Sequence, residues 1–230
     1  ADSLTWTQHK DKIYKADVTK LKDGSGYVGT WSLAKAPRYV CKSKAPGDCT
    51  KKYHLARSPN YKPPDEPEEY KYMKHWYMAD GGSGVPDCTP SAETKECDKK
   101  TWSLNTLTDV GHFPDTGEPQ PDLTLKTLPD LVGATVTIND GESGFWTANF
   151  PVKTHNKAAG KITIDGEFYA LSRDHKGIRA YSHYFVQNKL SLLDSPGEYW
   201  FDEATSTLYV WKNDDAQWSD IEISTDAEDQ

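Results

Sequence analysis

Residues 192–211 constrain the fold more tightly than any other part of the chain, because turn residues there precede two short strand-like runs. The sequence Asp194-Ser195-Pro196-Gly197 has turn chemistry, since proline fixes one backbone dihedral and glycine permits conformations that other residues avoid. The runs 198–202 and 207–211 are rich in aromatic and β-branched residues, and polar residues 203–206 separate them. The segment therefore predicts a β-hairpin that follows a tight turn.

Apolar residues just before this turn predict a short helix. Val186, Leu190 and Leu193 fall at positions i, i+4 and i+7, which places them on one face of a helix. Glu198 and Asp202 raise the possibility of paired carboxylates for acid–base chemistry. We favour the interpretation that they cap the turn and lie on the surface of the hairpin. An alternative is that one of them anchors the turn through hydrogen bonds.

The block 192–202 with 207–211 resembles a signature of secreted right-handed parallel β-helix proteins, roughly L-L-D-x-P-G-E-W-Y-x-D followed by a strand L-Y-x-W. Weaker resemblance continues in residues 184–188 and 55–60. The resemblance implies an extracellular β protein related to those that act on or bind polysaccharides. It implies that this chain corresponds to the β-rich module that adjoins the parallel β-helix in those proteins. The rungs of the β-helix, which would carry the catalytic groups, are expected beyond residues 221–223. The resemblance supplies no catalytic motif.

Composition independently favours a mostly β fold. Aromatic residues make up 12% of the chain, with eight Trp and 13 Tyr, and the mean hydropathy is −0.80. Residues 135–138, 162–164 and 221–223 alternate β-branched and polar side chains, and Asp-Gly turn dipeptides follow the first two runs. We therefore expect an antiparallel β-sandwich or barrel-like domain with long Pro-rich loops and one or two short helices.

We expect a single β-rich domain over residues 1–230. Residues 58–130 hold ten of the 14 prolines, which predicts a long irregular region without regular central strands. Such a region in a compact domain is usually functional or interfacial. Residues 27–31 are a plausible strand, residues 131–224 contain the best-defined strands, and residues 225–230 form an acidic tail.

The four cysteines predict a disulfide framework. Seven residues separate Cys41 from Cys49 and eight separate Cys88 from Cys97, and both pairs lie in loop-like sequence. Four cysteines allow three connectivities, of which local pairing is the one we favour. These spacings do not fit the close cysteine pairs of zinc sites, so two disulfides in an oxidising, extracellular or cell-surface setting are expected.

Charge is distributed unevenly along the chain. Residues 1–62 carry 13 Lys and Arg against 5 Asp and Glu, whereas residues 63–230 carry 14 against 30. A solvated acidic surface is the simplest interpretation, and the alternative is head-to-tail association of basic and acidic ends into rings or filaments. With a pI near 5.4, nucleic acid is not an expected partner. Membrane insertion is not expected either, since every apolar run is too short.

Aromatic residues in loop-like sequence are the candidates for binding a glycan or a partner, because amphipathic rings suit sugar faces and protein interfaces. Each of them has the alternative of packing in a core. No nucleotide, metal or cofactor site is predicted: the seven histidines form no ligand motif, and the glycine-rich residues 24–29 lack the context of a dinucleotide fingerprint. The binding candidates are Tyr61, Tyr72, Trp76, Tyr77, Trp102 and Trp146.

These observations lead to a hypothesis of a non-catalytic, extracellular structural protein that self-associates head-to-tail. The alternative is a carbohydrate-binding accessory module of a polysaccharide-active β-helix enzyme. A glycoside hydrolase or polysaccharide lyase is a third hypothesis, for which the sequence identifies no catalytic residue because a carboxylate pair assembles in space.

Overall fold

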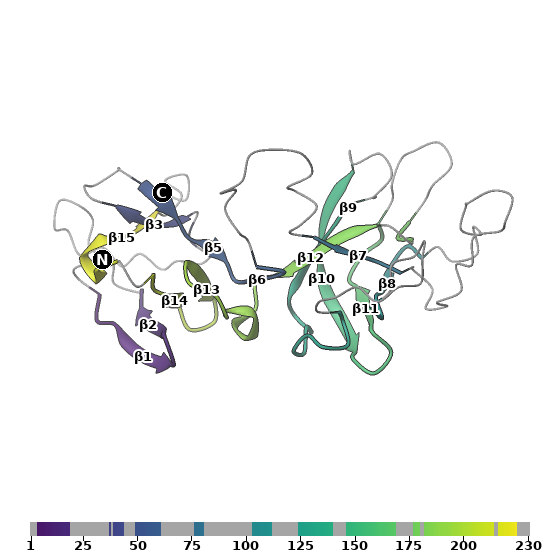
Figure 1. Cartoon of the computed structure of the whole chain (residues 1–230), viewed down its shortest axis with the longest axis horizontal. Coiled ribbons are helices and arrows are strands. Elements are labelled where there is room, and N and C mark those ends of the chain that lie inside the picture. The colour runs from purple at the N-terminus through teal and green to yellow at the C-terminus, as the bar shows by residue number, and fades with distance from the viewer. Residues whose placement is uncertain are drawn as a thin grey trace, which may run out of the picture. The chain divides into compact units, whose positions relative to one another are not determined.

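The computed structural model (Figure 1) describes residues 4–18, 37, 39–43, 49–60, 76–80, 103–111, 124–139, 146–168, 177–179, 182–213 and 216–224. Its contacts divide the chain into two compact units. Unit 1 comprises Ala1–Arg57 with Asn188–Gln230, and unit 2 comprises Ser58–Gln187. The single β-rich domain over 1–230 stays a prediction.

Unit 1 contains two sheets. The first has five strands in the order β1-β2-β14-β13-β5, and only its β5–β13 pairing is parallel. The second has three antiparallel strands in the order β15-β3-β4. The strands are β1 (Thr7–Lys10), β2 (Ile13–Asp17), β3 (Tyr39–Ser43), β4 (Cys49–Lys52), β5 (His54–Leu55), β13 (Glu198–Asp202), β14 (Thr207–Trp211) and β15 (Ile221–Ser224).

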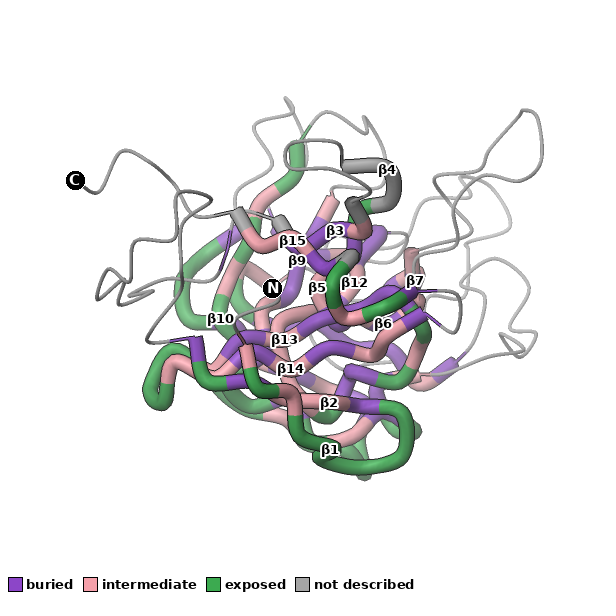
Figure 2. The backbone as a smooth tube through the Cα atoms, turned by 90° about the vertical axis from the view of Figure 1, so that its left-hand side faces the viewer, coloured by how far each residue is buried: buried purple, intermediate pink, exposed green. Residues whose placement is uncertain are grey.

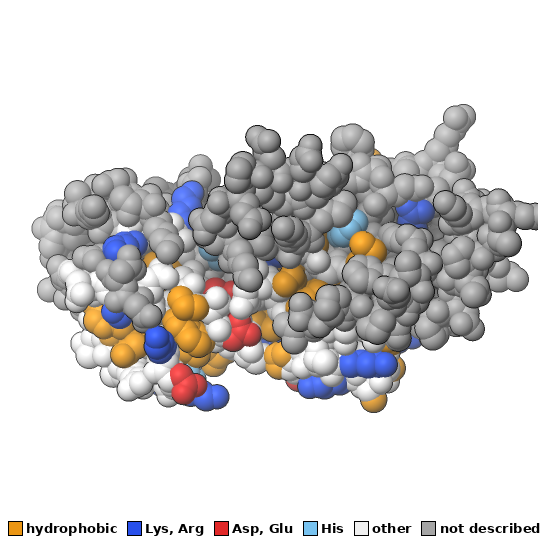
Figure 3. Space-filling model, viewed as in Figure 1, with side chains coloured by type: hydrophobic (Ala, Val, Ile, Leu, Met, Phe, Trp, Pro, Cys, Tyr) orange, Lys and Arg blue, Asp and Glu red, His pale blue; other side chains and the backbone are white. Residues whose placement is uncertain are grey.

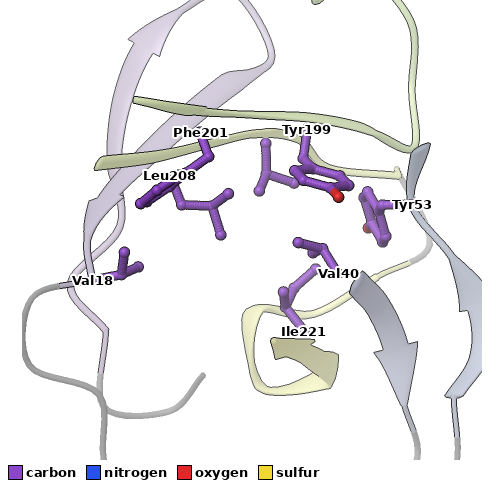
Figure 4. Close-up of a cluster of buried hydrophobic side chains, with 8 residues drawn as sticks. Val18, Val40, Tyr53, Tyr199, Phe201, Leu208 and Ile221 are labelled. Carbon is purple, nitrogen blue, oxygen red and sulfur yellow. The ribbon is translucent and has the colours of Figure 1, made fainter. Parts of the chain in front are cut away.

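The core of unit 1 lies between these two sheets. Along β14 the buried Leu208 and Val210 alternate with half-buried neighbours, as Figure 2 shows by colour. Figure 4 shows that Leu208 points toward the same interior as Val40 of β3 and Ile221 of β15. One face of the five-stranded sheet is therefore packed against the smaller sheet, as in a β-sandwich.

Unit 2 is built on a seven-stranded sheet with the order β6-β12-β9-β10-β11-β8, in which β7 also pairs with β12. Tyr184 lies opposite Ile138 and Val186 opposite Val136, and all four are fully buried. The strands are β6 (Arg57–Ser58), β7 (Tyr77–Met78), β8 (Thr106–Thr108), β9 (Thr135–Asn139), β10 (Thr147–Asn156), β11 (Lys161–Ile164) and β12 (His183–Gln187).

The structure confirms the mostly β fold with antiparallel, sandwich-like sheets, and the described residues form no closed barrel. The predicted hairpin is confirmed as β13 and β14, and the runs at 135–138, 162–164 and 221–223 lie in β9, β11 and β15. The predicted helix is wrong in extent. A single 3-10 turn, η3 (Leu190–Leu192), precedes the tight turn, and Val186 belongs to β12 because it pairs with Val136.

Several expectations fall on residues outside those described. These are the strand at 27–31, Cys88, Cys97, the side chain of Cys49, the acidic tail 225–230 and most of the Pro-rich region. Cys41 is buried and disulfide-bonded, while the local pairing stays a prediction. Within 58–130, the two short strands β7 and β8 lie at sheet edges. No helix in the described part of the chain has the length and hydrophobicity of a membrane span.

Candidate functional site

One row of residues crosses the five-stranded sheet of unit 1 from β13 to β1. Trp200 pairs with Tyr209, Tyr209 with Lys15, and Lys15 with Thr7. Residues directly opposite one another in antiparallel strands project from the same face of a sheet. The register therefore places an indole, a phenol, an ammonium group and a hydroxyl side by side on one face.

The rings in this row are in contact. The centroids of Trp200 and Tyr209 lie 5.3 Å apart with an interplanar angle of 48°, and those of His9 and Tyr209 lie 5.0 Å apart at 83°. His9 is exposed, and the other two rings are half-buried. We call Trp200, Tyr209, Lys15 and Thr7, together with His9, the aromatic row.

The aromatic row lies on the face of the sheet that points away from the core. Leu208 and Val210 flank Tyr209 in β14 and are fully buried, so alternation directs Tyr209 to the opposite side. In β13, Trp200 alternates in the same way with the buried Tyr199 and Phe201. In Figure 3, hydrophobic side chains are interleaved with charged ones over the visible face of unit 1.

Glu198, in the same hairpin, anchors the turn. Its Oε2 accepts hydrogen bonds from the backbone N–H groups of Asp194 and Ser195, each at 3.2 Å, and its Oε1 accepts one from that of Arg57 at 3.4 Å. Burial raises the pKa of this carboxyl to about 8. The alternative that one of the two acids anchors the turn is therefore confirmed for Glu198.

Asp202 caps the other end of β13. Its Oδ1 accepts a hydrogen bond from the Ala204 N–H at 3.1 Å, and its Oδ2 accepts one from the Thr205 hydroxyl at 2.7 Å. These bonds stabilise the hairpin loop that residues 203–206 form. Both acids of the motif thus serve the turn and the hairpin, as their position in the sequence suggests.

The predicted binding residues have different surroundings. Trp76 is half-buried, with its ring edge-on to Phe185 at a centroid distance of 4.7 Å. Tyr77 is a core residue: its ring lies 5.3 Å from that of Tyr184, and its hydroxyl shares a 2.6 Å hydrogen bond with Ser58. Trp146 is 40% exposed. The remaining three candidates, Tyr61, Tyr72 and Trp102, lie outside the described residues.

A second group of titratable side chains is buried in unit 2. Tyr184 donates a hydrogen bond to Asp109, and Asp80 Oδ2 accepts one from the Val110 N–H at 2.5 Å. Asp109 and Tyr184 are fully buried, so they offer no surface to a substrate. No group of three or more potential metal ligands occurs among the described residues.

Comparisons with known proteins give few matches. No family model matches the chain, and no curated protein matches it either. A solved structure named glycoside hydrolase aligns with a TM-score of 0.47 at 15% identity, over 96% of this chain and 30% of that one. That degree of likeness does not support an argument about function. The described residues contain no parallel β-helix.

Proposed function

We propose that this chain is a non-catalytic, extracellular polysaccharide-binding protein and that its aromatic row binds sugar rings. The observation that supports this proposal is the contact between Trp200 and Tyr209 on the solvent face of the sheet. Aromatic rings combine a large apolar surface with a polar edge, which suits the apolar faces and hydroxyl rims of sugars.

The polar members of the row extend the same surface. Lys15 supplies an ammonium group with three donors, and the Thr7 hydroxyl both donates and accepts. Adjacent strands lie about 4.8 Å apart, so a row across four strands extends for roughly 14 Å. The row is therefore long enough for more than one sugar unit of a linear chain.

Retention on immobilised polysaccharides tests this function. Trp200→Ala should weaken binding at least tenfold, equivalent to about 1.4 kcal/mol, whereas Trp200→Phe retains a ring and most of the affinity. Equal affinity of the wild-type protein and Trp200→Ala across the panel would contradict the proposal.

Self-association is a second candidate function, and the exposed edge of the five-stranded sheet favours it. All four side chains of β1 are exposed. Lys10 on this edge is basic, whereas Glu222 on β15, an edge strand of the smaller sheet, is acidic. Edge strands present backbone groups to other chains, although the irregular register between Gln8 and Lys10 disfavours long pairing. Sedimentation should show oligomers that dissociate as salt is raised; a monomer at every salt concentration would exclude this function.

A further inference from the structure

A face of the unit 2 sheet presents amide and hydroxyl groups in register. In one row across β10, β9 and β12, Asn149 lies opposite Thr137, and Thr137 lies opposite Phe185. In the adjacent row, Thr147 lies opposite Asn139, and Asn139 lies opposite the buried His183. Buried apolar residues, among them Val136 and Ile138, alternate with these residues along β9 and face the other side.

Hydrogen bonds fix the orientation of these polar groups. Thr137 donates from Oγ1 to Asn149 Oδ1 at 2.7 Å, and Asn139 donates from Nδ2 to Thr147 Oγ1 at 2.9 Å. Asn149 and Thr147 are exposed, Asn139 is half-buried, and Thr137 is buried. Because the Asn149 Oδ1 is held by Thr137, the orientation of the Asn149 amide is fixed, and its Nδ2 group supplies two donors.

An aromatic pair borders the polar groups. Phe185 continues the row of Thr137, and the Trp76 ring meets it edge-on at 4.7 Å. Both rings are half-buried, so part of each is accessible at the surface. We call Trp76, Phe185, Thr137, Asn149, Asn139 and Thr147 the amide face.

None of the six residues of the amide face carries a charge, which distinguishes it from the aromatic row with Lys15. Fixed amides and hydroxyls beside an aromatic surface match a ligand with many hydroxyl groups and an apolar ring face. An anionic ligand would find no charged partner among these six residues, and a charge left without a counterion is unfavourable. The complementary ligand is therefore a neutral sugar.

We propose that the amide face is a second sugar-binding site, specific for a neutral oligosaccharide and independent of the aromatic row. It rests on the proposed function only in that both ligands are sugars. The site would bind through the Asn149 amide and the Trp76 ring, while Thr137 holds the amide in its orientation.

Isothermal titration of the full chain with neutral gluco-, xylo- and manno-oligosaccharides tests the proposal. The wild-type protein should bind two ligands, and Trp200→Ala should retain one site. In the Trp200→Ala background, Asn149→Asp should weaken that remaining site at least tenfold, because it exchanges the amide donors for a negative charge. Trp76→Ala should weaken it to a similar extent.

Asn156→Asp is the matched control, since it makes the same change in the same strand at an exposed residue outside the amide face. A single site abolished by Trp200→Ala would overturn this inference and leave the proposed function intact. A remaining site that Asn149→Asp does not affect would also overturn the inference. Absence of binding to these oligosaccharides, together with no retention on any immobilised polysaccharide, would overturn both proposals.

Discussion

Tyr184 donates a hydrogen bond to Asp109 across 75 residues of sequence, with 2.5 Å between the phenol oxygen and Oδ2. The second carboxylate oxygen of Asp109 accepts a hydrogen bond from the Gly111 N–H at 2.9 Å. The pKa of Asp109 is raised to about 7, chiefly by burial and also by the nearby Asp80, while the hydrogen bonds from Tyr184 and Gly111 oppose the increase. The same burial raises the pKa of Tyr184 well above its ordinary value.

The first prediction is that Asp109 makes the protein less stable as pH rises from about 4 to about 7. Below its ordinary pKa of 3.8, Asp109 is protonated in both the folded and unfolded states. Between 3.8 and about 7 the folded state retains a proton that the unfolded state has lost, so the free energy of unfolding falls by at most about 1.4 kcal/mol per pH unit. Above about 7 its contribution no longer changes.

Denaturant unfolding at a series of pH values measures this slope. Asp109→Asn keeps a neutral side chain at every pH, so the slope of this variant should be shallower than that of the wild-type protein over pH 4–7. Tyr184→Phe removes the donor and should raise the pKa of Asp109 further. Identical slopes for the wild-type protein and Asp109→Asn would contradict the prediction.

The second prediction concerns the turn anchor Glu198. Its pKa of about 8 lies above the ordinary value of 4.5, so its contribution to stability also declines with rising pH, between about 4.5 and 8. Glu198→Ala leaves three backbone N–H groups without their acceptor and should destabilise the protein by about 1–3 kcal/mol. Glu198→Gln retains one oxygen acceptor and should cost less. Thermal unfolding of both variants at pH 6 measures the difference.

The third prediction compares two glycines that both have positive φ. Gly160 has φ +59, and a Cβ there would overlap the Asp109 carbonyl oxygen; Gly133 has φ +83 and no atom within 4 Å of such a Cβ. Gly133→Ala should cost only the backbone strain, about 1–2 kcal/mol. Gly160→Ala should cost about 1–3 kcal/mol more, because it also overpacks the site. Equal unfolding midpoints would show that the Asp109 backbone adjusts freely.

Local turn chemistry explains why residues 194–211 were predictable from sequence. Pro196 and Gly197 define the turn, and the polar loop 203–206 separates two strands whose bounds match those expected. The helix before the turn was overestimated, because the i, i+4, i+7 pattern joins Val186 of β12 to Leu190 of η3 and to Leu193, which lies just after η3. Pairing with β9, which is distant in sequence, decides the conformation of that residue.

The aromatic row was not predicted, although part of its signal is present in the sequence. Strict alternation in 207–211 places Tyr209 on the face opposite Leu208, but sequence alone does not show which face is buried. Trp200 and Tyr209 face each other across the predicted hairpin, whereas His9 becomes a neighbour of Tyr209 only because β14 pairs with β2, which is distant in sequence, and β2 pairs with β1. The Asp109–Tyr184 bond has the same non-local origin.

The fourth prediction separates stability from binding with two adjacent residues of β14. Leu208 is fully buried in the core of unit 1, so Leu208→Ala should destabilise the protein by about 2–5 kcal/mol. Tyr209 is half-buried on the opposite face, and its loss removes mainly ring contacts with Trp200 and His9, which are worth roughly 0.2–1 kcal/mol each. Tyr209→Ala should therefore be the milder change in an unfolding experiment.

Sugar binding should show the opposite order. Leu208→Ala, measured well below its unfolding midpoint, should bind polysaccharide like the wild-type protein, because it alters only the face of the sheet turned to the core. Tyr209→Ala should lose affinity, and Tyr209→Phe should retain most of it, since the ring provides the contact surface. If the affinity loss of each variant instead followed its loss of stability, the aromatic row would be a structural surface and not a binding site.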